Sequence, residues 1–206
     1  IARWTPVNTT YAFSYYLENA NDDGYTNIGT YSMTAESGSV ITTLDTNTIQ
    51  RGLQSLRSDY QFFTYDEEAT QLANETYNAN TRVYNIVVNG DGSTAISVFY
   101  SRNTYNIAFD VVSRNNVLTM NGVNYTSDTN NYTFNAKYEA DIATLWPTYD
   151  NFTSFASSSR PFTGWSGGTA DNSTYTSKRL TLTSDLIADT TLNSTTSYTA
   201  KYGTAV

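Results

Sequence analysis

The chain has 206 residues, which is enough for one large domain or for two of about 100 residues each. Its formal net charge of −8 makes nucleic acid and anionic membranes unfavourable partners, because both are negatively charged. Cysteine and histidine are both absent, which excludes disulfides, thiolate nucleophiles, histidine-based triads and the usual zinc sites. No apolar run reaches the roughly 20 residues of a membrane-spanning helix, so we expect no membrane insertion.

Aromatic residues make up 15% of the chain, and tyrosine alone occurs 18 times. Together with the many threonines, these residues suit the pleated, half-buried surface of a β-strand. Charged residues also make up only 15%, so the charged helix formers are scarce. The composition therefore predicts a folded chain that is mostly β.

In the first half of the chain, apolar and polar residues alternate in four segments, at residues 11–17, 25–33, 82–88 and 94–100. A period of two predicts strands. In the last of these segments the alternation puts Ile96, Val98 and Tyr100 on one face, which we expect to face the core.

A different period appears between the second and third of these strands. Ile49 and Leu53 recur at helical spacing, which predicts a helix over 45–57 with Asp45 or Thr48 at its first turn. Gly52 is expected to weaken this helix by about 1 kcal/mol relative to alanine.

The second half opens with an echo of the first. An Asn-Thr-aromatic pattern begins at Asn8 and again at Asn103, about 95 residues later, which places a boundary near 101–103. Beyond it the patterns predict strands at residues 105–112, 162–165 and 197–202. A short helical piece is predicted from Ala140 to Trp146, ended by Pro147.

A second internal repeat joins Ala, a cation and an aromatic ring, at residues 2–4, 136–138 and 200–202. We interpret residues 1–4 as the closing strand of a preceding repeat, and the chain as a piece of a longer array. The predicted fold is a β-rich α+β fold of two tandem β-grasp-like modules, 1–102 and 103–206. Each is expected to be a small mixed sheet crossed by a short helix.

Two segments resemble known repeat families. Phe162–Trp165 followed by Tyr198–Tyr202 resembles the Listeria–Bacteroides repeat, also called the internalin B-repeat, with its Phe-x-Gly-Trp and closing Tyr-x-Ala-Lys-Trp. The closing aromatic is Tyr202 here instead of Trp. In the first half, Gly90–Thr94 leading to Phe99–Asn103 is similar to the terminal hairpin of a mucin-binding-protein-like β-grasp repeat.

These resemblances imply the repeat region of a bacterial cell-surface adhesin, extracellular and attached to the cell wall through other parts of the parent protein. They imply neither catalytic residues nor a cofactor, and the partners would be neighbouring repeats. We expect a non-catalytic stalk or spacer, monomeric in isolation. The alternative is a module of the same kind of protein that binds host glycan or mucin.

Other candidate sites are judged against simpler interpretations. Asn19, Asn21 and Asp23 imitate the start of a calcium-binding loop, but Thr30 stands where its bidentate Glu belongs, so a plain turn is favoured. The acidic run 66–68 is interpreted as a solvated surface loop that lacks the converging carboxylates of a glycosidase.

The predicted core residues are large and apolar or aromatic. They lie on the segments predicted to be strands or helices, where burial is the usual state of such side chains. The set consists of Trp165, Phe162, Tyr202, Trp146, Ile49 and Leu53.

Overall fold

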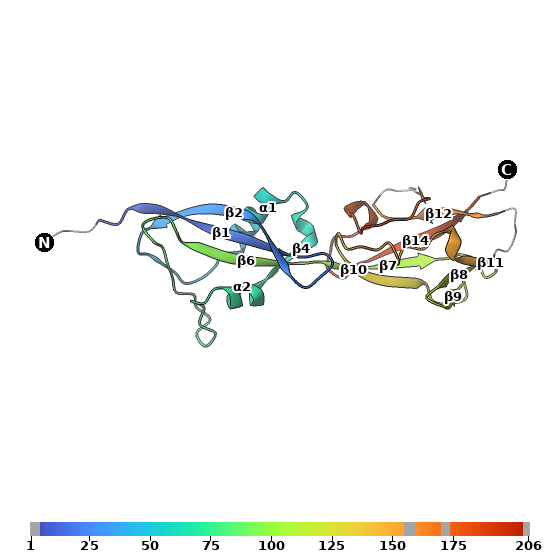
Figure 1. Cartoon of the computed structure of the whole chain (residues 1–206), viewed down its shortest axis with the longest axis horizontal. Coiled ribbons are helices and arrows are strands. Elements are labelled where there is room, and N and C mark those ends of the chain that lie inside the picture. Colours follow the sequence, from blue (N-terminus) through green and yellow to red (C-terminus); the bar gives the residue numbers. More distant parts are fainter. Residues whose placement is uncertain (1–4, 155–159, 170–173, 204–206) are drawn as a thin grey trace. The chain divides into compact units, whose positions relative to one another are not determined.

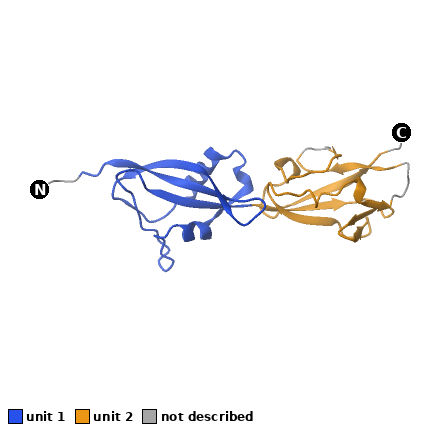
Figure 2. Ribbon diagram, viewed as in Figure 1, with its two compact units in different colours: residues 1–102 blue, residues 103–206 orange. Residues whose placement is uncertain are grey.

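The computed structural model describes residues 5–154, 160–169 and 174–203. The chain divides into two compact units, residues 1–102 and residues 103–206 (Figures 1 and 2). Each contains a mixed β-sheet, and both α-helices found among the described residues belong to the first unit. The fold is therefore a β-rich α+β fold. None of the helices in the described part of the chain is long and apolar enough to cross a membrane.

The main sheet of the first unit has four strands in the order β2-β1-β6-β4. These are β1 (Asn8–Glu18), β2 (Tyr25–Glu36), β4 (Phe63–Asp66) and β6 (Ala95–Arg102). β1 and β2 form an antiparallel hairpin, and β4 is antiparallel to β6. The two central strands β1 and β6, the first and last of the unit, run parallel to each other.

Alternation along the central strands forms the core of the first unit. Phe13, Tyr15 and Leu17 on β1 are buried, with exposed fractions of 3% or less. They lie in register with the core face of β6, whose three residues Ile96, Val98 and Tyr100 are also buried. The pattern of every second residue therefore identified the inner face of β6 correctly.

Helix α1 (Thr46–Leu56) covers this face of the sheet, and it begins one residue later than the predicted range. The carboxylate of Asp45 accepts hydrogen bonds from the backbone N–H groups of Asn47 and Thr48, so Asp45 caps the first turn. The hydroxyl of Tyr15 donates a 2.8 Å hydrogen bond to the carbonyl of Ile49 and ties α1 to β1.

A second helix, α2 (Glu67–Ala73), begins where the sequence was interpreted as a surface loop, so that interpretation of 66–68 is wrong. Asp66 accepts a 2.9 Å hydrogen bond from the N–H of Ala69 and caps the helix, and acidic residues occupy its first turn. In Figure 1, α1 and α2 lie on opposite sides of the β1–β6 ribbon.

The remaining elements of the first unit are short. These elements are β3 (Val40–Ile41), the 3-10 helix η1 (Tyr60–Phe62) and β5 (Ile86–Val87). Of the predicted strand 82–88, only the part that forms β5 is a regular strand, and it pairs with β3 in a two-stranded sheet.

The main sheet of the second unit has the order β10-β7-β14-β12-β13. Its first and last strands, β7 and β14, are again adjacent and parallel, with β10 antiparallel to β7 and β12 antiparallel to β14. The strands are β7 (Thr104–Asp110), β10 (Tyr132–Lys137), β12 (Phe162–Ser166), β13 (Thr174–Tyr175) and β14 (Thr195–Tyr202).

A smaller three-stranded sheet and two 3-10 helices complete the second unit. They are β8 (Val117–Met120), β9 (Val123–Tyr125), β11 (Phe152–Ser154), η2 (Tyr149–Asn151) and η3 (Ser184–Leu186).

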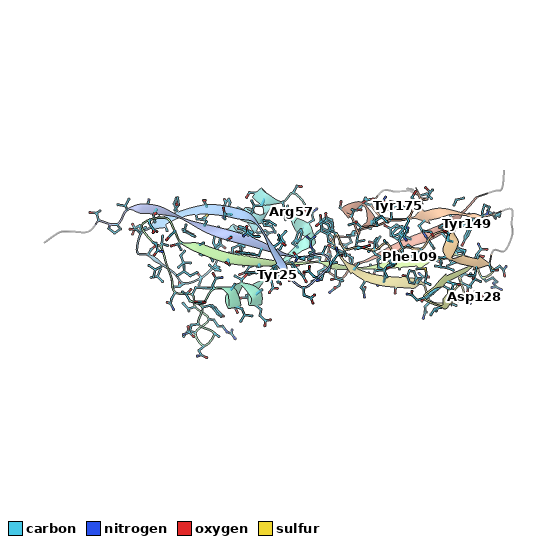
Figure 3. The ribbon with its side chains drawn as sticks, viewed as in Figure 1. Tyr25, Arg57, Phe109, Asp128, Tyr149 and Tyr175 are labelled. Carbon is cyan, nitrogen blue, oxygen red and sulfur yellow. The ribbon has the colours of Figure 1, made fainter. Side chains whose placement is uncertain are left out.

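Phe109 on β7 lies at the centre of the second core and is labelled in Figure 3. Its ring is fully buried and meets Trp165 edge-on at 4.9 Å and Trp146 edge-on at 5.1 Å between ring centroids. It also stacks on Tyr198 of β14 at 5.5 Å. Aromatic pairs at these separations stabilise a core beyond their buried area.

The predicted helix from Ala140 to Trp146 is wrong. Only one helical turn forms there, closed by the N–H of Trp146 on the carbonyl of Ile142. The preceding backbone is occupied elsewhere: Ile142 donates to the carbonyl of Leu180, and Leu182 donates to the carbonyl of Ala140. The segment therefore pairs in an extended form, and the described part of this unit has a mixed sheet without a crossing α-helix.

Candidate functional site

A surface cavity of about 790 Å³ lies in the first unit. It is enclosed by the segment before α1, by the end of β4 with helix α2, and by the loop after α2. Three tyrosines from these elements, Tyr65, Tyr77 and Tyr84, line it together with hydroxyl, amide and charged side chains. Such a mixture of rings and convergent polar groups is typical of a small-molecule site.

The three tyrosines form a connected wall. The ring centroids of Tyr77 and Tyr84 are 4.8 Å apart, with their planes tilted by 50°. The phenol groups of Tyr65 and Tyr84 also interact electrostatically. Burial raises the pKa of both Tyr65 and Tyr84 above the ordinary value, so both hydroxyls stay protonated at neutral pH. Neutral phenols can both donate hydrogen bonds to a ligand and accept them.

Helix α2 supplies the carboxylates. Glu67 and Glu68 are exposed in its first turn and line the cavity. The side-chain amide of Gln71 donates a 3.0 Å hydrogen bond to the carboxylate of Glu67 one turn earlier. Opposite charge comes from Arg82, which also lines the cavity.

The backbone of Arg82 adopts a left-handed conformation, with φ of 57°. This is uncommon for a residue other than glycine. The hairpin around it is held by Asn78, whose carbonyl accepts a 2.7 Å hydrogen bond from the N–H of Arg82 and whose side chain accepts from Asn80 and Thr81. These hydrogen bonds hold the loop in a defined turn, and this turn places Arg82 in the lining of the cavity.

Asp66 is adjacent to the cavity but faces the sheet. It accepts hydrogen bonds from the hydroxyls of Tyr25 on β2 and Ser101 on β6, at 2.8 and 3.0 Å. Partial burial pushes the pKa of Asp66 upward, but these bonds and that from the N–H of Ala69 outweigh it and hold the pKa below its ordinary value. In its ionised form, Asp66 therefore links β2, β6 and α2.

This arrangement is suited to binding and poorly suited to glycoside cleavage. Glu67 and Glu68 are consecutive helical residues, so their side chains leave the helix about 100° apart. A glycosidase needs two carboxyl groups that face each other across the bond to be cleaved. Ring faces, phenols, an amide and charged groups instead provide the contacts that a polyhydroxylated ligand requires.

The predicted calcium loop forms the β1–β2 turn. The side-chain amide of Asn19 donates a 2.7 Å hydrogen bond to the carboxylate of Asp22 and accepts one of 2.7 Å from the hydroxyl of Thr26. The carboxylate of Asp22 also accepts a hydrogen bond from the N–H of Gly24. The carboxamide of Asn19 is thus occupied by the turn itself. Within residues 5–154, 160–169 and 174–203, no three His, Cys, Asp or Glu side chains are grouped to hold a metal ion.

No family model, characterised protein or solved structure matches the chain. The resemblances to the internalin B-repeat and to the mucin-binding-protein-like repeat therefore rest on the quoted residues alone. Those residues can still be judged by what they do in the fold.

The Phe-x-Gly-Trp segment is β12, where it packs inward. Trp165 is 1% exposed, and its indole N–H donates a 2.7 Å hydrogen bond to the carbonyl of Pro147. Gly164 has a φ of 151°, and an added Cβ would lie 2.6 Å from the carbonyl oxygen of Tyr175. Only glycine fits this position, because both the backbone angle and the space exclude a side chain.

The other predicted core residues have the following positions. Trp146, Phe162, Ile49 and Leu53 are buried. Tyr202 is half-buried, and its hydroxyl donates a 2.7 Å hydrogen bond to the carbonyl of Val111. With Trp146 and Trp165 both buried, neither ring is free to stack on a sugar at the surface. The predicted strand at residues 1–4 lies outside the described residues.

A smaller cavity of about 330 Å³ lies in the second unit, between the segment after β7 and strand β14. Its lining includes the cations Arg160 and Lys201 and the ring of Tyr202. The larger cavity has more aromatic surface and more hydrogen-bonding groups, so it is the candidate ligand site.

Sequence reasoning missed the residues of the larger cavity. One signal was available: Asp66 followed by Glu67 and Glu68 is typical of a helix start, with a capping carboxylate and acidic residues in the first turn. Nothing comparable marks Tyr77 or Tyr84, because eighteen tyrosines are spread along the chain. Their convergence depends on the path of a long loop between α2 and β5.

Proposed function

We propose that the chain is a non-catalytic stalk or spacer region of a bacterial cell-surface adhesin, and that each unit is a β-grasp-like module. The two main sheets support the second part of this proposal. Numbered in chain order within each sheet, the strands of both sheets begin second-first-last-third, with the first and last strands parallel, and the second sheet has its fourth strand, β13, as an additional edge strand. In the first unit α1 also covers the sheet, as expected of a β-grasp module. The described part of the second unit has this strand order without an α-helix, so the repetition favours two copies of one sheet architecture.

The observation that carries the stalk function is the path of the chain through each sheet. The first and last strands of each unit are neighbours and run in the same direction. The chain therefore enters a sheet at one end of the strands and leaves it at the opposite end. A module of this kind can be joined head to tail without a long return connection.

The connection between the units is also short. β6 ends at Arg102 and β7 begins at Thr104. In the first unit the guanidinium of Arg102 donates a 2.6 Å hydrogen bond to the carbonyl of Glu18. In the second unit the carbonyl of Asn103 accepts one of 2.9 Å from the N–H of Tyr138. A single residue between two strands is much shorter than a flexible tether, and this favours the spacer.

The reach of the parent protein tests this function. One, two or four copies of the chain would be placed between a cell-wall anchor and a terminal epitope displayed on a bacterium. Gold labelling and electron microscopy then measure the distance from the cell surface to the epitope. We expect equal increments for each added copy; a distance that does not change with copy number would contradict the proposal.

A second candidate function is the binding of a host glycan or mucin, and the tyrosine-lined cavity favours it. Tyr77 is a half-buried ring of that wall on the loop after α2, so Tyr77→Ala should remove stacking area without opening the core. Tyr149, labelled in Figure 3, is 52% exposed and lies outside the cavity, which makes Tyr149→Ala the matched control.

A glycan array probed with the chain and both variants decides between these functions. Binding that Tyr77→Ala abolishes and Tyr149→Ala preserves would support the glycan site. If the chain binds no glycan, the proposal of a glycan site is contradicted. If both variants lose glycan binding equally, the assignment of the glycan site to this cavity is contradicted.

A further inference from the structure

The parallel strand pairs have a mechanical consequence. In the first unit, β1 and β6 are in register from Ala12 opposite Ala95 to Leu17 opposite Tyr100. In the second unit, β7 and β14 are in register from Asn106 opposite Thr195 onward. In both cases the strand nearest the beginning of the unit is hydrogen-bonded to the strand nearest its end.

A force on the two ends of such a unit acts along its strands. It draws β1 backward from its amino end and β6 forward from its carboxyl end, so the two strands are sheared past each other. Hydrogen bonds between parallel strands are evenly spaced along the pair. They therefore share the load and must fail together, whereas a pair pulled apart from one end loses its bonds one at a time.

Core packing supports this pair from one side. The register sets Phe13 opposite Ile96 and Tyr15 opposite Val98, and all four side chains are buried. Water is thus kept from the inner face of the hydrogen bonds. In the second unit the stacked pair of Phe109 and Tyr198 takes the equivalent place.

The outer edge of β6 is protected as well. β4 pairs with β6 only from Phe99 onward. Before that point, residues of α2 and its C-cap bond the edge of β6. The side chain of Asn74 accepts a 3.2 Å hydrogen bond from the N–H of Ser97 and donates one of 2.8 Å to its carbonyl. The hydroxyl of Thr70 accepts a 3.0 Å hydrogen bond from the N–H of Phe99. The strand that would carry the load is therefore held along both edges.

We propose that each unit is a shear-resistant mechanical clamp, in which the adjacent parallel terminal strands carry tension applied along the chain. The biological role rests on the proposed stalk function, since a stalk between a cell wall and an attached target transmits force. The resistance itself follows from the strand order and the register alone. Helix α2 strengthens the first clamp by closing the open edge of β6.

Single-molecule force spectroscopy on the whole chain tests the clamp by pulling in two directions. The chain has no cysteine, so introduced thiols are unique attachment points. Pulling through the chain ends shears both units. Pulling through Thr10→Cys and Ser93→Cys, two exposed positions at the same end of the β1–β6 pair, unzips the first unit.

At equal loading rate we expect a severalfold higher unfolding force for the first unit when it is pulled through the chain ends. Equal forces in the two directions would overturn the clamp. Asn74→Ala should lower the end-to-end force, and Gln50→Ala on the exposed side of α1 should leave it unchanged. Circular dichroism confirms beforehand that each variant is folded.

A disulfide provides an independent check of the geometry. Ala12 and Ala95 are Cα partners in the parallel pair, and adjacent strands lie at a spacing that a disulfide spans. In Ala12→Cys/Ala95→Cys, oxidation should reduce the extension of the first unit to roughly an eighth, because the residues between the cysteines are closed off.

Reduction should restore the full extension, of about 300 Å for this unit. An extension that oxidation does not change would overturn the strand assignment. The clamp and the stalk fail separately. A low end-to-end force overturns the clamp even where reach grows with copy number, and a high force in an array that adds no reach overturns only the stalk.

Discussion

Replacing Gly52 with alanine gives opposite expectations from the sequence and from the structure. Helix propensity alone favours alanine by about 1 kcal/mol at this position in α1. In the structure, however, an added Cβ would lie 1.9 Å from the hydroxyl oxygen of Tyr15 and 2.6 Å from the ring carbon that carries it. Tyr15 is fully buried, so its ring has no space into which to move.

The magnitude follows from these contacts. Forcing an extra methyl group into a packed core costs about 1–3 kcal/mol. Moving the phenol also breaks its buried hydrogen bond to the carbonyl of Ile49, which costs about 1–3 kcal/mol. After the gain in helix propensity is subtracted, we expect Gly52→Ala to lower the free energy of unfolding by about 3 kcal/mol.

Urea denaturation of the whole chain, followed by far-UV circular dichroism, measures this difference. Gln54→Ala, at an exposed position of the same helix, is the control and should change the free energy of unfolding little. In a Tyr15→Phe background the cost of Gly52→Ala should fall but not disappear, because the ring carbon is still too close. A neutral or stabilising Gly52→Ala would refute the packing of α1 on β1.

Two further predictions concern single side chains. Trp165→Ala should lower the free energy of unfolding by about 3–5 kcal/mol, measured by urea denaturation, because the ring is buried and its N–H is bonded to Pro147; unchanged stability would show that the ring is exposed. Asp66 has a lowered pKa, so its stabilising bonds with Tyr25 and Ser101 are complete above about pH 4 and are lost as the pH falls through that lowered value. Asp66→Asn should therefore destabilise the chain more at pH 7 than at pH 3 in thermal melts, and an equal effect at both pH values would contradict the assignment.

Much of the sheet could be predicted because its residues alternate. β1, β2 and β6 are half-buried strands with one apolar and one polar face, which is the pattern that sequence shows most directly. Helix α1 was visible for the same reason, since Ile49 and Leu53 repeat at helical spacing and Asp45 caps the first turn.

The errors came where distant backbone contacts override the local pattern. The segment from Ala140 to Trp146 has helical spacing, but its N–H and carbonyl groups pair with Leu180 and Leu182. These partners lie some 40 residues away along the chain, and single-sequence periodicity carries no information on such pairing.

Helix α2 was missed for a different reason. Its seven residues are too few to establish a period, and its only strong signal is the capping Asp66 with the acidic first turn. The candidate site depends on this helix and on the loop that carries Tyr77 and Arg82, so it could not be found before the fold was known.

Solution scattering on chains joined head to tail tests the stalk most directly. Single, double and triple copies would be prepared and their maximum dimensions measured by small-angle X-ray scattering at several concentrations. Because the chain enters and leaves each sheet at opposite ends, we predict that the maximum dimension grows by the same amount with each added copy. A maximum dimension that grows only as the cube root of mass, as it does when units pack into one globule, would contradict the stalk.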